Sequence, residues 1–372
     1  MRFQRYLLLL TIAVVFAMGL VMVFNTTSAD ILDRDLDQDT HHAMLRHILY
    51  AICGCVAGLI AWAIGYRNLL RASPFLLGLC VIMLIMVLIP GVGKTVNGAR
   101  RWIALGPYSM QPSECVKFVI PLFYIHIYLK TMDTPWDLRQ FAKVMGMVLA
   151  PAALVFLEPD TGTTFIIGAS ILVLLLLTRI KWKFWVLPTL VLTVLAAGLA
   201  WQLPYARGRI AVYLNPEMDI LGRGHQPYQA KIAAGSGGLI GRGIGKSLQK
   251  LNYLPEAQND YIGAIYAEEF GFSGILLLIS LYMLITYLGF HIAFQSKDKG
   301  AFYLAAIITF LISFQAFLNL GVVSGLLPSK GINLPFFSQG GTSLMANLAA
   351  IGVLLNISMV AEKGTQKVYT KD

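Results

Sequence analysis

Residues 254–271, LPEAQNDYIGAIYAEEFG, decide how the rest of the chain is interpreted. They place a carboxylate, Asp260, where a long polar loop enters an apolar stretch long enough to cross a bilayer. A segment rich in Gly, Lys and Arg precedes that loop end. A carboxylate in this position would contact both the aqueous loop and the lipid headgroup zone. The location suits chemistry on a substrate with an apolar tail and a polar head.

The composition around this stretch is that of a membrane protein. Apolar residues make up 57% of the chain and charged residues only 13%, against roughly 25% charged in soluble domains. We therefore expect an all-α integral membrane protein, a single polytopic domain over residues 1–372. Ten stretches approach the roughly 20 apolar residues that a membrane helix needs. They are 6–24, 46–65, 72–90, 113–129, 141–157, 162–178, 184–202, 261–290, 301–325 and 341–361.

The charges of the loops predict the orientation of these spans. With both termini in the cytoplasm, the inner segments hold fifteen Lys or Arg and five acids, which is the pattern of short basic inner loops. These segments are 1–5, 66–71, 130–143, 179–183, 295–300 and 362–372. The formal charge of +10 is thus explained by topology, and nucleic-acid binding is not needed. The first span resembles a signal sequence, but no clean cleavage site follows it, so we expect it to be retained.

The polar residues gather in the expected outer segments. The segment 203–260, between spans seven and eight, is too long for a simple connector, and loops of this length are usually functional or disordered. Its aromatic and apolar residues are compatible with short amphipathic helices on the membrane surface. The glycines of 235–245 permit tight turns and close backbone approach. Residues 30–39 hold five aspartates, which indicates either a solvated loop or a protein-contact site.

Charged residues near the hydrocarbon are costly and therefore suggest function. Glu114 and Lys117 share a helix face, as a structural ion pair or as the polar floor of a cavity in which Arg100 or Arg101 binds phosphate. Asp160, with Glu158, belongs either to a solvated turn or to the same cavity. Seven cations of the long loop either pair with nearby acids or attract an anionic headgroup. They are Arg207, Arg209, Arg223, Lys231, Arg242, Lys246 and Lys250.

Asp260 stands at the end of that loop, with Glu268 and Glu269 further into the eighth span. The pattern alone indicates a helix N-cap. A general base at the headgroup level is equally compatible, and one side chain can fill both roles. Neither a zinc pattern nor a disulfide framework is present in the sequence.

Several motifs, taken in order, resemble one known family. They are NGARRWI, QPSE, EPDTGT, AAGSGGLIGRG, LPEAQNDYI, AEEFGFSG and LPSKGINLPFFSQGGTS. Together they are similar to the SEDS family, which comprises FtsW, RodA and SpoVE. The resemblance implies ten spans with a large outer loop between spans seven and eight. It also implies polymerisation of lipid II into peptidoglycan glycan strands, in division or elongation, beside a class B penicillin-binding protein.

The resemblance also assigns residues. Asp260 matches the family's essential loop aspartate. The implied substrate-binding residues are Arg101, Glu114, Lys117, Asp160 and Arg209. Arg101, Lys117, Arg209 or a divalent cation, Mg²⁺ or Mn²⁺, would stabilise the leaving pyrophosphate. The chain departs from the family at Gln258, Asn259 and Tyr261, where His-Thr and Phe are usual, and at Gln339, where Tyr is common. Residues 245–250 and 328–331 are more similar to FtsW and SpoVE than to RodA.

Two other classes of function compete with the polymerase. A flippase for a lipid-linked sugar would also need a polar cavity with charged groups, near mid-membrane and between related halves. The candidate charges instead collect at the outer ends of the spans, and no repeat of halves is evident. A non-catalytic scaffold for wall synthesis predicts that Asp260 and Glu114 can be replaced without loss.

Overall fold

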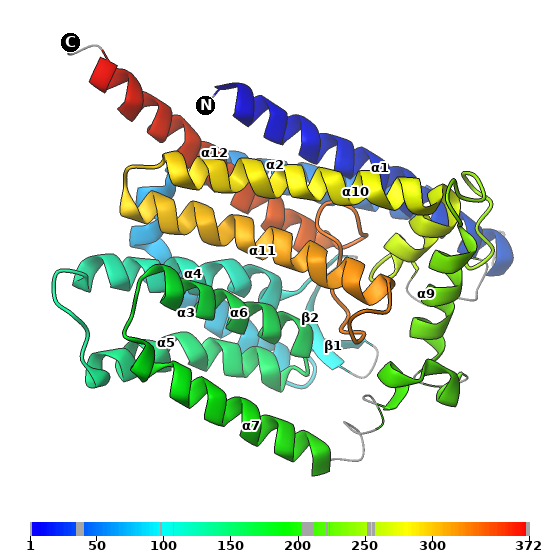
Figure 1. The fold of residues 1–372 in the computed structure, drawn as a ribbon, viewed down its shortest axis with the longest axis horizontal. Coiled ribbons are helices and arrows are strands. Elements are labelled where there is room, and N and C mark those ends of the chain that lie inside the picture. The colour runs from blue at the N-terminus through cyan, green and yellow to red at the C-terminus, as the bar shows by residue number, and fades with distance from the viewer. Residues whose placement is uncertain are drawn as a thin grey trace.

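The computed structural model describes residues 2–34, 41–96, 99–106, 108–202, 208, 211–220, 222, 224–250, 254 and 257–369. Most of them are helical, and the long helices lie side by side with their axes roughly aligned (Figure 1). The long helices are α1 (Arg2–Arg34), α2 (His42–Ile64), α3 (Tyr66–Leu88), α4 (Pro112–Thr131), α5 (Leu138–Leu157), α6 (Thr161–Leu177), α7 (Val186–Gln202), α10 (Ile262–Gln295), α11 (Lys299–Val323) and α12 (Gly341–Tyr369).

These helices occupy the ten apolar stretches expected from the sequence. Within the described residues, seven are long and apolar enough to cross a membrane: α1, α2, α3, α5, α10, α11 and α12. The other three are α4, which carries Glu114, Lys117 and Lys130, and α6 and α7, each of 17 residues. The chain is therefore a multi-pass membrane protein, as the composition predicts.

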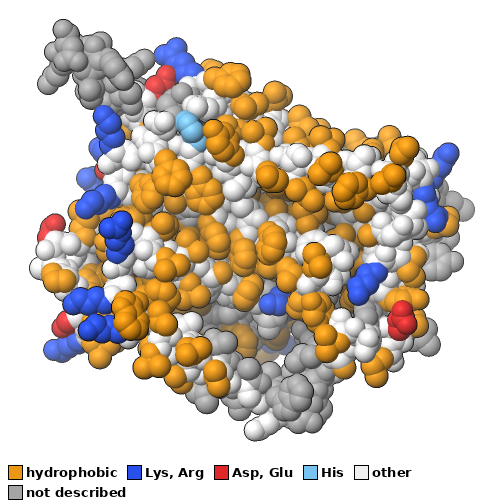
Figure 2. Space-filling model, viewed as in Figure 1, with side chains coloured by type: hydrophobic (Ala, Val, Ile, Leu, Met, Phe, Trp, Pro, Cys, Tyr) orange, Lys and Arg blue, Asp and Glu red, His pale blue; other side chains and the backbone are white. Residues whose placement is uncertain are grey.

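The surface carries the belt that a bilayer requires. Hydrophobic side chains cover the middle of the bundle, and Lys and Arg gather at the end where both termini lie (Figure 2). At that end Arg2 Nε and Arg5 Nη2 bind the two carboxylate oxygens of Glu362, at 2.9 and 2.6 Å. The first and last helices are thus joined, which places the two termini on one side of the bundle.

A small sheet is the part of the fold that the sequence did not predict. Strands β1 (Gly93–Val96), β2 (Ala99–Leu105) and β3 (Tyr108–Met110) form an antiparallel sheet in the order β1-β2-β3. The prediction of an all-α chain is wrong here, because an apolar-span search treats residues 91–112 as a connector. The sheet lies between α3 and α4 in the chain and holds β2 against the start of α4.

The described part of the long loop contains short helices. Within this part, residues 208 and 211–214 are helical. A 3-10 helix, η2 (Pro216–Asp219), and the α-helix α9 (His225–Ser236) follow, and α9 packs against α10. The short 3-10 helix η1 (Trp182–Phe184) leads into α7. Leu214 is 67% exposed, and the amphipathic character of the surface segments stays a prediction. The Asp-rich stretch 30–39 lies mostly outside the described residues, although α1 runs into it as far as Arg34.

Helix α10 is broken near its start, and this break positions the loop. Gly271 has non-helical dihedral angles (φ 66°, ψ −163°). The backbone amides of Phe272 and Ser273 donate instead to the carbonyls of Gly238 and Leu239, at 2.9 and 3.1 Å. The loop thus satisfies groups that the kink frees from the helical pattern. Two turns of α10 precede the kink and lead back to the turn that carries Asp260.

Candidate active site

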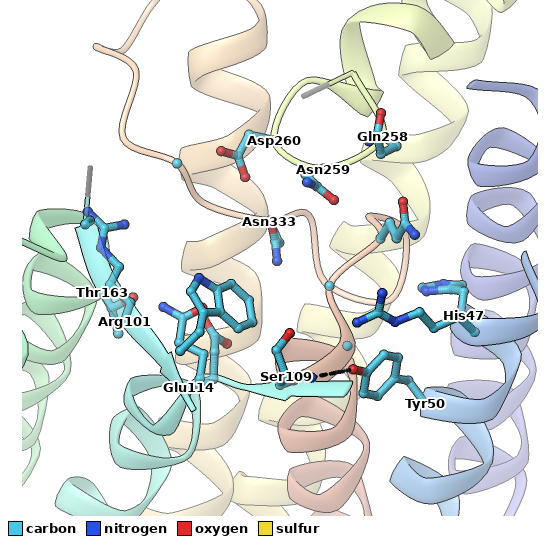
Figure 3. Close-up of a pocket in the computed structure, with 18 residues that line it drawn as sticks. His47, Tyr50, Arg101, Ser109, Glu114, Thr163, Gln258, Asn259, Asp260 and Asn333 are labelled. Atoms are coloured by element: carbon cyan, nitrogen blue, oxygen red, sulfur yellow. Dashed lines mark hydrogen bonds between the residues drawn. The ribbon is translucent and has the colours of Figure 1, made fainter. Parts of the chain in front are cut away.

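A cavity of about 430 Å³ opens where the starts of α2, α4, α6 and α12 meet the turn before α10. Its wall is polar and is drawn from elements far apart in the chain (Figure 3). The helix α2, the sheet strands β2 and β3, and the loop between α11 and α12 all contribute. Of the predicted site residues, Arg101, Glu114 and Asp260 line it together. The structure therefore gathers three residues separated by up to 159 positions.

Asp260 lies in a turn immediately before α10. The N-cap residue of α10 is Tyr261, whose side chain makes no capping hydrogen bond, so the prediction that Asp260 caps this helix is wrong. A Cβ built on Gly331 would lie 3.3 Å from Asp260 Oδ2, which shows that the carboxylate packs closely against that backbone. The hydroxyl of Tyr261 donates to Ser329 Oγ at 2.8 Å.

Two amide side chains on α11 hold the Asp260 turn and the loop between α11 and α12 in place. Asn319 Nδ2 donates to the carbonyls of Asp260 (2.8 Å) and Ile332 (2.7 Å). One helical turn earlier, Gln315 Nε2 donates to the carbonyl of Asn333 at 2.9 Å. Both side chains are buried, where such hydrogen bonds are costly to break. These two residues fix the backbone on which Asp260 is displayed.

Asp160 does not line the cavity, although it contacts residues that do. It caps α6 by accepting from the amide of Thr163 (3.1 Å), and its other oxygen accepts from Gln111 Nε2 (2.9 Å) and Ser113 Oγ (3.1 Å). Arg101 Nη1 lies 3.9 Å from its first oxygen. Because its oxygens are already bonded, Asp160 orients Arg101 and Gln111 from behind the wall.

Glu114 and Lys117 form the predicted pair on one face of α4. Lys117 Nζ donates to Glu114 Oε2 (2.6 Å) and to Gln315 Oε1 (2.7 Å), and the lysine side chain is 1% exposed. Glu114 faces the cavity and Lys117 lies behind it. The structural ion pair and the polar floor, which the sequence left as alternatives, therefore coexist.

Glu158 is fully buried between α5 and α6, so the solvated-turn interpretation of this connector is wrong. Neither carboxyl oxygen has a hydrogen-bond partner among the described residues. Burial, and secondarily the neighbouring charge of Asp160, raise its pKa to about 8, against the opposing effect of Arg101. Glu158 is therefore largely protonated at neutral pH.

The remaining acids of this region pair with the long loop. Ser247 Oγ donates to Glu268 Oε2 at 2.6 Å. Lys250 Nζ donates to Glu269 Oε1 at 3.2 Å. Arg242 Nη1 lies 3.5 Å from Glu268 Oε1. Two of the loop cations are thus engaged by α10, a partner that the sequence did not suggest. The predicted Arg209 lies outside the described residues.

Several wall residues were not predicted. They include Arg46, His47, Tyr50, Trp102, Ser109, Asn333 and Gln339. The first three lie at the start of α2, where the charge of Arg46 on the outer side of a span could have identified them. Of the others, Trp102, Asn333 and Gln339 lie within the motifs NGARRWI and LPSKGINLPFFSQGGTS, a signal that could have identified them.

The wall offers little to a protein-bound metal. Within the described residues no group of three or more His, Cys, Asp and Glu side chains is arranged to hold an ion. The described residues therefore do not form a resident metal centre. Mg²⁺ is usually held by one or two carboxylates together with substrate phosphates, so a cation that enters with the substrate stays a prediction.

The comparisons with known proteins define the class. Residues 5–363 match the family model of FtsW, RodA and SpoVE, described as cell cycle protein. The chain belongs to this family.

Curated relatives and solved structures agree along almost the whole length. The "Probable peptidoglycan glycosyltransferase FtsW" of Coxiella burnetii is 40% identical, over 93% of this chain and 94% of that protein. The stage V sporulation protein E of Bacillus subtilis is 37% identical, over 95% and 94%. A solved chain from "Structural coordination of polymerization and crosslinking by a peptidoglycan synthase complex" superposes with a TM-score of 0.76 at 24% identity, over 96% and 98% of the two chains. This last likeness concerns the fold alone.

Proposed function

We propose that the chain is a peptidoglycan glycosyltransferase that polymerises lipid II by inverting transfer at the outer face of the cytoplasmic membrane. The observation that carries this proposal is the cavity in which the Asp260 turn meets Arg101 and Glu114 at the ends of the membrane helices. Its curated relatives include proteins named for this activity, and a cavity at the bilayer rim can take a polar headgroup while the lipid tail stays in the membrane.

The membrane topology is part of the proposal. Ten spans, counting α4, α6 and α7 with the seven longer apolar helices, bring both termini to one side, as the ion pairs of Glu362 require. The basic inner segments place that side in the cytoplasm. The cavity then faces outward, and the loop 203–260 between α7 and α10 is extracytoplasmic. Accessibility labelling of a cysteine introduced at Leu214 tests this orientation.

In the reaction, Asp260 acts as the general base. Its carboxylate takes the proton of the 4-hydroxyl of the acceptor sugar as that oxygen attacks the anomeric carbon of the donor. The bond from that carbon to the pyrophosphate breaks, and its electron pair leaves on the pyrophosphate. A positioned base of this kind typically contributes about 10²–10⁴-fold. The polyprenyl tails of both substrates stay in grooves between helices.

The other predicted residues divide into two roles. Arg101 and Glu114 face the cavity and are proposed to contact the polar headgroup directly. Lys117 and Asp160 are proposed to position them, because Lys117 binds Glu114 and Asp160 faces Arg101. Arg209 keeps its proposed role in binding the anionic headgroup.

A class B penicillin-binding protein is the proposed partner. The similar solved chain comes from a peptidoglycan synthase complex that coordinates polymerisation and crosslinking, and glycan strands made here would need a transpeptidase to crosslink them. Co-purification of the full chain with such a transpeptidase, and comparison of polymerisation with and without it, tests this partnership.

The central experiment is polymerisation of purified lipid II by the wild type and by Asp260→Asn. Asparagine keeps the shape of the side chain and removes the base, so product should fall to background while the melting temperature in detergent is unchanged. Near-normal product from this variant would remove Asp260 from the mechanism. A flippase would instead translocate lipid II across vesicles without polymerising it, and a scaffold would tolerate replacement of both Asp260 and Glu114.

A further inference from the structure

The two arginines of the cavity wall differ in how many partners their guanidinium groups already have. Within the described residues, Arg46 on α2 and Arg101 on β2 are the arginines that line the cavity. Arg101 donates to the backbone carbonyls of Glu158 (3.1 Å) and Pro159 and faces Asp160. Arg46 pairs with no carboxylate of the described residues, and its guanidinium lies 5.8 Å from the ring centre of Tyr50. Arg46 is therefore the wall cation with the greater capacity to bind an anion.

The histidine next to Arg46 is an unsatisfied donor. His47 also lines the cavity, its side chain is 1% exposed, and neither ring nitrogen has a hydrogen-bond partner among the described residues. Its ring is held by stacking on Phe16, with centroids 5.5 Å apart and planes at 22°. A buried N–H without a partner carries a desolvation cost that a bound ligand can remove. In either charge state a histidine ring has at least one such N–H.

The start of α12 completes this end of the cavity. Gly340 and Gly341 line it, and the first amides of a helix lack intrahelical partners and favour anions. A Cβ on Gly341 would lie 2.6 Å from the Tyr50 ring, so Tyr50 packs directly on the helix start. Tyr50 is itself fixed to β3, since its hydroxyl donates to the Ser109 carbonyl at 3.3 Å. The element that carries Arg46 and His47 is thus held firmly beside α12.

The end of the cavity lined by Arg46 and His47 is separate from Asp260, the proposed general base. Figure 3 shows Asp260 and Arg101 on one side of the cavity, and Tyr50 and His47 on the other. In an inverting displacement the nucleophile and the leaving group lie on opposite sides of the reacting carbon. A base beside the nucleophile is therefore expected across the cavity from the group that binds the leaving group.

We propose that Arg46 and His47, with the start of α12, form the subsite for the donor's pyrophosphate leaving group. This inference rests on the proposed function. As the bond from the anomeric carbon to the pyrophosphate oxygen breaks, its electron pair becomes negative charge on that oxygen. The Arg46 guanidinium and the His47 N–H stabilise this charge, while Asp260 receives the acceptor's proton on the opposite side. Arg101 then serves the headgroup of the acceptor.

The test uses the full chain in detergent with lipid II as substrate and inorganic pyrophosphate as competing anion. Arg46→Gln should lower kcat/KM by about 10- to 100-fold, the value of one or two charge-assisted hydrogen bonds. It should weaken inhibition by pyrophosphate by a similar factor. Arg46→Lys keeps the charge and should recover part of both, and His47→Ala should produce a smaller loss of both than Arg46→Gln. Lys94→Gln, which removes an equal charge from the exposed β1 strand outside the cavity wall, is the matched control and should change neither.

The outcomes distinguish a failure of the subsite from a failure of the proposed function. Wild-type kcat/KM and wild-type pyrophosphate inhibition in a folded Arg46→Gln variant would overturn the subsite alone. Asp260→Asn should keep Arg46-dependent pyrophosphate binding, measured by calorimetry, while losing polymerisation. A wild type that binds pyrophosphate through Arg46 but never polymerises lipid II would overturn the proposed function and, with it, the leaving-group role, and would leave Arg46 as part of an anion-binding site. Equal competition by phosphatidylglycerol micelles would assign the site to membrane headgroups and overturn the leaving-group role.

Discussion

Two acidic regions flank the first turns of α10, and they differ in what surrounds the carboxylates. Asp260 precedes the helix and faces a polar cavity. Glu268 and Glu269 lie two turns later, each 1% exposed, and are bonded to the loop 242–250 and to α1. A single sequence motif thus contains one carboxylate that lines a cavity and two that hold the scaffold.

The comparison of Asp260 with Glu268 shows two uses of a carboxylate that is costly to bury. Glu268 accepts hydrogen bonds from Ser247 Oγ and from two backbone amides, and Arg242 Nη1 lies 3.5 Å from its Oε1 as an ion pair. Such saturation stabilises a buried charge and removes its capacity to react. Asp260 occupies a turn whose backbone is fixed by Asn319, so its position is rigid while its side chain lines the cavity. Buried acids that are fully bonded indicate structure, and acids that face a cavity indicate chemistry.

Exchanging the two kinds of acid for their amides should produce the largest contrast. Asp260→Asn should lower lipid II polymerisation by about 10²–10⁴-fold, because the base is lost, with an unchanged melting temperature. Glu268→Gln should do the opposite and lower the melting temperature first, since its carboxylate accepts from Ser247 and forms an ion pair with Arg242. Both quantities are measured on the same detergent preparation. A normal melting temperature together with lost activity in Glu268→Gln would break the comparison.

Removing Glu269 should destabilise the folded protein, because it leaves the buried Lys250 ammonium without its charged partner. Lys250 Nζ binds Glu269 Oε1 (3.2 Å), Asn25 Oδ1 (2.7 Å) and the Gly245 carbonyl (2.7 Å). Glu269→Ala leaves this buried ammonium without its charged partner, a loss of about 3–5 kcal/mol. The double variant Glu269→Ala with Lys250→Met should recover much of it, because no unpaired charge then remains. Chemical denaturation of the purified variants measures both, and equal stability of single and double variants would contradict the pairing.

The contact between loop and helix can also be disturbed through the backbone. A Cβ on Gly241 (φ 89°) would lie 2.1 Å from the Glu269 carbonyl, so Gly241→Ala combines a clash with left-handed strain and should cost about 3 kcal/mol. Gly238→Ala is the matched control. Gly238 has φ 57° and nothing within 4 Å of its Cβ position, so it should lose only the strain, about 1–2 kcal/mol. Indistinguishable melting temperatures for the two would show that the close approach is unimportant.

The sequence predicted the helices well because apolar length alone identifies them. It could not predict the sheet 93–110, whose strands are short and polar enough to resemble a connector. Asp260, Glu114 and Arg101 were found through motif resemblance and charge near the membrane rim. Arg46 and His47 were missed, because their importance depends on the start of α12 meeting α2, a contact between positions about 300 residues apart. Asp160 was found, but its hydrogen bonds show a positioning residue that the motif could not reveal.

Glu158 is a third kind of acid and offers the mildest test of the comparison. It is buried like Glu268 but has no hydrogen-bond partner among the described residues. Burial raises its pKa from 4.5 to about 8. The folded state therefore holds a proton that the unfolded chain releases between these two values. Stability from this group is complete below the lower value and is lost as the pH rises through about 8.

The wild type should accordingly melt at a lower temperature near pH 9 than near pH 6, by a few degrees. Glu158→Gln keeps the size of the side chain without a titrating group, so the difference between the two pH values should shrink. Comparing wild type and variant at both pH values cancels the titration of all other groups. An unchanged difference would mean that Glu158 finds a donor in solution, and it would then belong with Glu268 and Glu269 as a bonded scaffold acid.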